Sequence, residues 1–188
     1  MKMNVLTTDL PDVLIVEPKV FSDDRGFFME VHRQDEFADA GLDLDFVQDN
    51  QSRSRYGTVR GLHFQWQPAM GKLMRVTRGK AFLAAVDIRK NSPNLGRWIG
   101  IEVSEEDKRQ VWAPAGFARG FCALSEVVDI QYKCTGTYNQ ACESGILWND
   151  PEIGIKWPVD EPLLSDKDQQ AQTLAQWLEH PDSGNFKL

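Results

Sequence analysis

The stretch LMRVTRGKAFLAAVDIR at residues 73–89 decides the fold class, because it is rich in the apolar and β-branched residues that favour strands. Its longest purely apolar run, AFLAAV at 81–86, is far too short to span a bilayer. Turn signals such as SDDRG (22–26), KNSPNLG (90–96) and CTGTYN (134–139) punctuate the chain on both sides. Similar segments, each predicted to be extended, are DVLIVEPKVF (12–21), GFFMEVH (26–32), TVRGLHFQW (58–66), RWIGIEV (97–103), RQVWAPAG (109–116), GFCALSEVVDIQYKC (120–134) and GILWND (145–150). Many short strands with few helices between them predict a mainly β fold: a sandwich, a jelly roll or a barrel.

Helical patterns are confined to two places at the edges of this strand pattern. QDEFADAGL at 34–42 predicts a short helix that Gly41 ends. From Asp166 or Asp168 to His180, apolar residues recur at helical spacing behind acidic residues suited to a first turn, which predicts a C-terminal helix covering the end of a sheet. With 188 residues and no repeat or linker, the chain is expected to form a single domain over 1–188.

The charge is distributed unevenly along the chain. The formal net charge is −7, which argues against nucleic acid or an anionic membrane as a partner. Residues 53–90, however, contain nine Lys and Arg against the single Asp87. A positive stretch in an acidic protein predicts a small anionic ligand, and we interpret it as serving one diphosphate in a pocket.

The cysteines and the N-terminus predict a soluble, cytoplasmic protein. Cys122, Cys134 and Cys142 form an odd count without CxxC spacing, so neither a disulfide framework nor a zinc site is expected. The N-terminal sequence MKMNVLTTDLPDV lacks the basic and then apolar pattern of a signal peptide.

Missing motifs exclude several kinds of chemistry. The sequence contains no GxSxG, no GxxxxGK[ST] and no GxGxxG, which argues against a serine hydrolase, NTP hydrolysis and nicotinamide chemistry. Histidine occurs only at positions 32, 63 and 180, whereas jelly-roll metal enzymes usually need two or three imidazoles. Gln65 stands where a second ligand after His63 would be expected, so no metal site is predicted.

His63 is the strongest candidate for a catalytic base. It could be a core histidine bonded to a backbone carbonyl, but it lies between Arg60 and the strand that starts at Lys72, where an anion would come close to the ring. Strict alternation places Arg60 on the opposite face from His63. The two side chains can face one pocket only if a bulge or twist intervenes near Gly61.

Four other residues could complete an acid–base site, although each also has a structural interpretation. Tyr132 shares a predicted strand face with Val128 and Ile130, so its hydroxyl points into the barrel. Lys72 and Arg119 could be solvated charges, but Arg119 lies between two apolar runs, where a buried charge needs a partner. Asp168 could simply begin the C-terminal helix, or it could orient an imidazole.

Nine blocks of the sequence resemble the dTDP-4-dehydrorhamnose 3,5-epimerase family over nearly the whole chain. They are RGFFMEV (25–31), FVQDNQS (46–52), VRGLHFQ (59–65), KLMRV (72–76), VDIRKNSPNLGRW (86–98), APAGFARGF (113–121), QYKCT (131–135), WNDPEIGIKWP (148–158) and LLSDKD (163–168). The resemblance implies a cupin-type jelly roll (a double-stranded β-helix) with short peripheral helices. It also implies a homodimer that binds a dTDP-sugar and needs no cofactor.

The resemblance also assigns roles to individual positions. His63 matches the base, Asp168 the carboxylate that pairs with it, Tyr132 the proton donor on the opposite sugar face, and Lys72 the residue near the developing enolate. The implied substrate contacts within one subunit are Gln48, Asn50, Arg60, Lys72, Arg119, Tyr138 and Glu143. Contacts in the RGFFMEV block are Arg25, Phe27 and Glu30, of which Arg25 and Glu30 are expected to reach the neighbouring subunit's site.

One position departs from the family pattern, because this chain reads GFARGF where most members read GFAHGF. Arg119 keeps a donor and a permanent charge that suit an enolate oxygen, but it cannot shuttle protons as imidazole does. The implied activity is epimerisation at C3 and C5 of dTDP-4-dehydro-6-deoxy-D-glucose for rhamnose-containing polysaccharide such as O antigen. Open alternatives are a mono-epimerase, an epimerase for another nucleoside-diphosphate 4-keto sugar, a non-catalytic jelly roll that binds a sugar nucleotide, and a metal-dependent cupin oxygenase.

Overall fold

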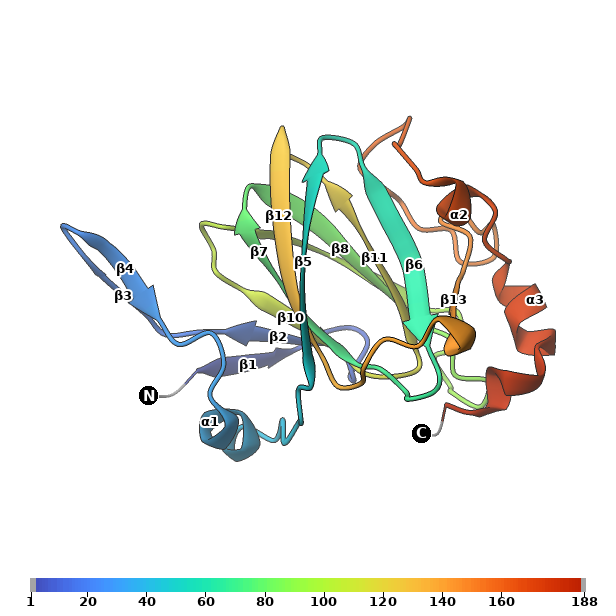
Figure 1. Ribbon diagram of the computed structural model, residues 1–188, viewed down its shortest axis with the longest axis horizontal. Coiled ribbons are helices and arrows are strands. Elements are labelled where there is room, and N and C mark those ends of the chain that lie inside the picture. The colour runs from blue at the N-terminus through green and yellow to red at the C-terminus, as the bar shows by residue number, and fades with distance from the viewer. Residues whose placement is uncertain (1–2, 187–188) are drawn as a thin grey trace.

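Two antiparallel sheets lie face to face in the computed structural model, which describes residues 3–186 (Figure 1). The six-stranded sheet contains, in spatial order, β1 (Asn4–Thr7), β2 (Leu14–Glu17), β10 (Gln110–Ala113), β7 (Lys72–Arg78), β12 (Val127–Cys134) and β5 (Gln48–Arg55). The five-stranded sheet contains β13 (Glu143–Gly145), β6 (Val59–Gln65), β11 (Phe117–Ala123), β8 (Lys80–Asp87) and β9 (Trp98–Ser104). Neighbours in space are mostly distant in sequence, so the sandwich is a jelly roll, and the predicted mainly β class is confirmed.

The alternating residues of β8 explain why AFLAAV is apolar throughout. Leu83 and Ala85 pack in the core between the two sheets, together with Met74, Phe121 and Ile130. Ala84 and Val86 point to the other face of the five-stranded sheet, where the C-terminal segment covers them. Because both faces of β8 are buried, the strand needs apolar side chains at every position.

A two-stranded hairpin, β3 (Val20–Asp23) and β4 (Gly26–Met29), projects from one side of the sandwich (Figure 1). The predicted strand at 12–21 is therefore two strands, because Pro18 lies between β2 and β3 and cannot donate to a ladder. The hairpin leaves large apolar side chains exposed, including Phe27 at 55% and Phe28 at 63%.

The helices are short and lie at the periphery, as predicted, but the C-terminal one differs from the expectation. They are α1 (Gln34–Asp39), α2 (Asp166–Gln169) and α3 (Leu174–Glu179), with 3₁₀ turns at Gln140–Cys142 and Pro181–Gly184. The prediction of a single helix up to His180 was wrong, because Gln172 leaves the helix to bridge Ile146 and its carbonyl accepts from the N–H of Leu147. Thr173 then caps a new helix through a capping box with Gln176.

Two strands that the sequence did not reveal are β1 and β5, and one segment is less extended than expected. The sequence of β5, QDNQSRSR, has no apolar residue, yet the strand pairs with β12 over its full length. Of GILWND, only Gly145 belongs to a strand, since β13 ends there. β5 was missed because its ladder partner stabilises it rather than its own propensity.

Candidate active site

A bulge in β6 places Arg60 and His63 on the same face of the five-stranded sheet. His63 lies opposite Arg119 of β11 and Arg60 lies opposite Phe121, so three residues of β6 span two of β11. Phe121 is a core residue between the sheets, so the side chains paired with this face point inward. The structure therefore contains the irregularity near Gly61 on which a shared pocket depended.

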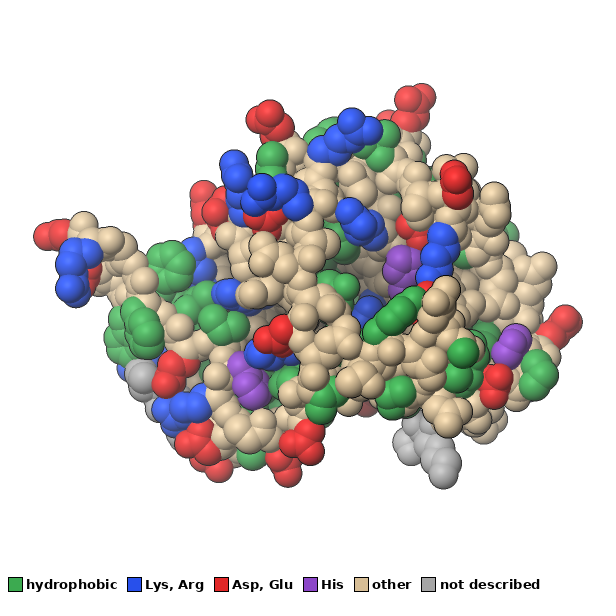
Figure 2. Space-filling view, viewed as in Figure 1, with side chains coloured by type: hydrophobic (Ala, Val, Ile, Leu, Met, Phe, Trp, Pro, Cys, Tyr) green, Lys and Arg blue, Asp and Glu red, His purple; other side chains and the backbone are tan. Residues whose placement is uncertain are grey.

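The facing sheet contributes its own inward row of polar side chains from three adjacent strands. Tyr132 of β12 lies opposite Asn50 of β5 and Met74 of β7, and it packs against the core between the sheets. Two positions along β12, Cys134 lies opposite Gln48 and Lys72. Figure 2 shows Lys and Arg side chains around a hollow in this region of the surface.

His63 and Asp168 form the closest polar pair in this region. The Nε2 atom of His63 lies 2.5 Å from Oδ1 of Asp168, which is 3% exposed on α2. The hydroxyl of Ser165 donates to Oδ2 of Asp168 at 2.8 Å, and the N–H of Gly61 also donates to this carboxylate. Burial by itself raises the pKa of Asp168, but the bonds from His63, Ser165 and Gly61 lower it below its usual value. Asp168 is therefore a buried carboxylate that fixes the imidazole.

Tyr132 and Lys72 form a second pair on the opposite sheet. The Nζ atom of Lys72 lies 5.0 Å from the centre of the Tyr132 ring. Burial, and then the charge of Arg119, lower the pKa of Lys72 to about 8. Burial raises the pKa of Tyr132, so its phenol keeps its proton at neutral pH and remains available to donate it.

Arg119 is a buried cation with donors to spare. Its Nη1 donates to the carbonyl oxygens of Met70 at 2.7 Å and of Ala113 and Pro114 at 3.3 Å. Its Nε and Nη2 are buried without a hydrogen-bond partner among the described residues. Burial lowers the pKa of Arg119 to about 10, so the side chain is still charged at neutral pH. A buried guanidinium with free donors is suited to an oxygen of a ligand.

Tyr138 and Glu143 stand at the edge of the same region. The Tyr138 hydroxyl donates to Oε1 of Glu143 at 3.0 Å, and the Tyr138 N–H donates to the side chain of Gln48. A cavity of about 630 Å³ adjoins this edge, and its walls include His63, Glu143 and Asp168. The structure thus brings together ten of the predicted site residues: Gln48, Asn50, Arg60, His63, Lys72, Arg119, Tyr132, Tyr138, Glu143 and Asp168.

Three predicted contacts lie elsewhere in the same chain. Arg25 and Phe27 are on the projecting hairpin, where Arg25 pairs with Asp23 at 2.6 Å. Glu30 follows the hairpin and pairs with Arg33 at 3.3 Å. Within one chain these three residues do not join the inner-face group.

The positive stretch at 53–90 does not serve a single pocket, so that interpretation was wrong in part. Arg53 pairs with Asp129 at 2.7 Å, Arg89 pairs with Asp87 at 2.6 Å, and Lys80 pairs with Glu102. The stretch runs through four strands in two sheets, and alternation sends its cations to different faces. Of its cations, Arg60 and Lys72 belong to the inner-face group.

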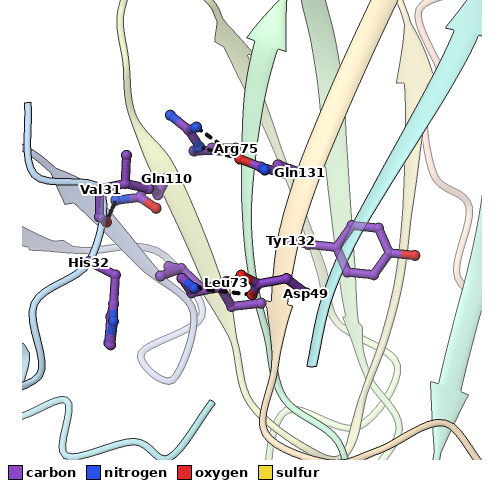
Figure 3. Close-up of a pocket in the computed structure, with 9 residues that line it drawn as sticks. Val31, His32, Asp49, Leu73, Arg75, Gln110, Gln131 and Tyr132 are labelled. Atoms are coloured by element: carbon purple, nitrogen blue, oxygen red, sulfur yellow. Dashed lines mark hydrogen bonds and ion pairs between the residues drawn. The ribbon is translucent and has the colours of Figure 1, made fainter. Parts of the chain in front are cut away.

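A separate cavity of about 280 Å³ lies on the outer face of the six-stranded sheet (Figure 3). The salt bridge between Lys133 and Asp49 and the bonds from Arg75 to Gln131 lie beside it. Tyr132 contributes to its wall, but the ring of Tyr132 points away from the other side chains drawn there. Alternation along β12 therefore separates this outer cavity from the inner-face group.

Sequence reasoning missed Ser165 and Lys167. Ser165 caps α2 and bonds Asp168, and its signal was a serine three residues before an acidic residue. Lys167, which pairs with Glu143, was hidden because a lysine in a polar turn normally lies in solvent. Within residues 3–186, no three His, Cys, Asp or Glu side chains gather closely enough to hold a metal ion. Nor does any helix in this range have the length and apolar character needed to cross a membrane.

The fold and the site define a jelly roll that holds a histidine–carboxylate pair opposite a tyrosine–lysine pair, as acid–base chemistry requires. The family model for dTDP-4-dehydrorhamnose 3,5-epimerase matches residues 7–176. The chain therefore belongs to the dTDP-4-dehydrorhamnose 3,5-epimerase family, a family of isomerases, and the expected cupin-type jelly roll is confirmed.

Individual relatives agree with this assignment. The dTDP-4-dehydrorhamnose 3,5-epimerase of Shigella flexneri is 55% identical over 172 residues, covering 90% of this chain and 95% of the relative. The enzyme of the same name from Pseudomonas aeruginosa is 52% identical, covering 88% and 93%. The crystal structure of dTDP-6-deoxy-D-glucose-3,5-epimerase from Legionella pneumophila in complex with dTDP-4-keto-L-rhamnose is 45% identical, with a TM-score of 0.89 over 92% of this chain and 93% of that one.

Proposed function

We propose that this protein converts dTDP-4-dehydro-6-deoxy-D-glucose into dTDP-4-dehydro-L-rhamnose by inverting C3 and C5. The observation that carries the proposal is the inward arrangement of His63 with Asp168 on one sheet and Tyr132 with Lys72 on the other. An epimerase needs a base on one face of the carbon and an acid on the opposite face, and the two sheets supply them separately.

The chemistry follows from the 4-keto group of the substrate, which acidifies the C–H bonds at C3 and C5. His63 removes the proton, and the electron pair of the broken C–H bond moves into an enolate with its charge on O4. Asp168 stabilises the imidazolium that forms and holds the ring in place. Tyr132 then gives its phenolic proton to the opposite face of the same carbon, which inverts the centre, and water restores the phenol.

Lys72 and Arg119 stabilise the O4 enolate in this scheme. Both are cations next to Tyr132, and the free donors of Arg119 can accept a new oxygen partner at no cost in existing hydrogen bonds. Arg119 does not exchange protons at neutral pH, so Tyr132 remains the proton donor for both carbons.

The nucleotide contacts are divided between two copies of the chain. Gln48, Asn50, Arg60, Tyr138 and Glu143 serve the substrate from within the subunit. The projecting hairpin delivers Arg25, Phe27 and Glu30 to the site of a second copy, and the exposed Phe27 and Phe28 give it an apolar surface to bury there. The proposed assembly is a cytoplasmic homodimer of single-domain subunits over 1–188. It acts without a cofactor to supply rhamnose for surface polysaccharide such as O antigen.

Deuterium incorporation from solvent tests the proposal. The purified protein, incubated in D₂O with dTDP-4-dehydro-6-deoxy-D-glucose, should incorporate deuterium at both C3 and C5. Exchange at one carbon would make it a mono-epimerase, and exchange only with a different nucleoside diphosphate would reassign the substrate. If no 4-keto sugar nucleotide exchanges, the enzyme proposal fails in favour of a binding module. Stoichiometric iron or manganese in elemental analysis would instead favour an oxygenase.

A further inference from the structure

Lys167 links two parts of the site that are otherwise far apart in the sequence. Its Nζ lies 2.5 Å from Oε1 of Glu143, the oxygen that also accepts from the Tyr138 hydroxyl. Glu143 begins β13, whose Gly145 lies opposite His63 in β6. One ion pair therefore connects α2 to the strand beside the base.

The position of Lys167 on α2 makes this link relevant to the base. α2 has only four residues, and Asp168, which bonds His63, follows Lys167 directly. Apart from its Ser165 cap, the ion pair from Lys167 is the side-chain tie between this turn and β13 among the described residues. A turn this short has little rigidity of its own, so cross-links to neighbouring strands fix its orientation.

Lys167 also balances the charge beside His63. The side chain of Glu143 is 17% exposed, and Lys167 is the cation that neutralises it. Both side chains border the cavity that His63 borders. The charged and titratable groups that face this part of the site are Asp168 and Lys167 from α2, Glu143 from β13, Arg60 on β6 itself, Arg119 from β11, Lys72 from β7, and His180 after α3.

We infer that Lys167 is a positioning residue for the epimerisation, which holds Asp168 against His63 and cancels the charge of Glu143 beside the base. The inference rests on the proposed function, because it concerns the same site. It assigns Lys167 no contact with the reacting carbons, since Lys167 acts through Asp168 and Glu143. Residues in such supporting roles typically change activity by roughly 10-fold to 100-fold when they are removed.

The test compares Lys167→Met, Lys167→Arg and the double variant Lys167→Met with Glu143→Gln, using Lys156→Met as the matched control at an exposed lysine. Lys167→Met should lower kcat by about 10-fold with little change in KM. The uncompensated Glu143 carboxylate favours a cationic imidazole, so the acid limb of the pH–rate profile should move up by roughly half a pH unit.

The companion variants separate the two effects. Lys167→Arg should restore both kcat and the pH profile, since it keeps the charge. In the double variant the acid limb should return to its wild-type position while kcat stays low, because the charge imbalance is gone but the tether is not restored. Lys156→Met should behave like wild type.

A wild-type pH profile and kcat in Lys167→Met would overturn the inference while leaving the proposed function intact. So would a loss of kcat with an unchanged pH profile that Lys167→Arg fails to rescue, with a matching fall in Tm, because that is the mark of a purely structural residue. If the wild-type protein exchanges no proton with any 4-keto sugar nucleotide, the proposed function fails first, whatever the variants do.

Discussion

The Nε2 atom of His63 and Oδ1 of Asp168 are 2.5 Å apart, although 105 positions separate the two residues in the chain. His63 stands on a central strand of the five-stranded sheet, and Asp168 stands on a four-residue helix after the last strand. The contact leaves Nδ1 of the imidazole as the nitrogen that can take a proton, because the other nitrogen faces the carboxylate. The pair behaves as one unit, a base with its orienting partner.

Replacing Asp168 by Asn should therefore lower kcat by about 100-fold or more, because the amide cannot stabilise an imidazolium as a carboxylate does. The measurement is kcat with dTDP-4-dehydro-6-deoxy-D-glucose beside the Tm of each variant. Asp166→Asn, at the exposed start of the same helix, is the control and should stay near wild type. Equal losses in both variants would show that damage to α2, rather than the lost carboxylate, causes the effect.

Replacing Tyr132 by Phe should separate proton removal from proton return. His63 can still exchange the substrate proton with solvent on its own face, but the opposite face lacks a donor, so deuterium enters without inversion. Product formation should fall by about 100-fold or more while exchange persists. NMR of the sugar in D₂O reads both quantities at once. Tyr56→Phe, at a side chain that is 58% exposed, is the control, and inversion at the wild-type rate in Tyr132→Phe would remove Tyr132 from the mechanism.

The lowered pKa of Lys72 predicts a basic limit to activity. Its ammonium is charged below about pH 8 and neutral above it, so O4 stabilisation, and with it kcat, should decline as the pH rises through about 8. Replacing Arg119 by Gln removes the charge that depresses this pKa, so the limb should move to higher pH even though the rate at neutral pH falls.

Lys72→Arg serves as the control for this limb, because guanidinium stays charged over the whole range. Its profile should be flat through pH 8, whatever its absolute rate. A basic limb that stays at the same pH in both variants would mean that another group titrates there.

The exposed hairpin predicts that the dimer depends on Phe28. Replacing Phe28 by Asp puts a charge into the surface that the second copy is proposed to bury, so the dimer should dissociate at micromolar concentration and activity should fall with it. Sedimentation velocity measures the mass, and activity at several protein concentrations measures the coupling. Ala175→Asp, at an exposed position of α3, should remain like wild type. A fully active monomer would disprove the delivery of hairpin residues to a second site.

Much of the candidate site was predictable because the relevant residues lie in short blocks with a defined local geometry. Alternation along β12 predicted that Tyr132 would share the inward face of Ile130, and the core confirms it. The bulge at Gly61 was predictable only as a condition, because it depends on how β6 pairs with β11. Without that pairing, alternation sends Arg60 to the wrong face.

Other features depend on contacts that no local pattern encodes. The break between α2 and α3 arises because Gln172 bridges Ile146, and the polar strand β5 exists because β12 offers it a ladder. The positive stretch looked like one feature because its residues are consecutive, yet Arg53 and Arg89 pair with acids from distant parts of the fold. Charge in sequence is a sum, whereas charge in space depends on the partners that folding supplies.

The sequence by itself determined the β-rich class, the apolar core strands and the chemical types available for catalysis, because periodicity and residue identity are local properties of the chain. Only the tertiary structure decided which of these groups meet. His63 meets Asp168, Lys72 meets Tyr132, and Arg119 keeps two donors free, because strand register and the closure of the two sheets fix distances between residues that are far apart in the sequence.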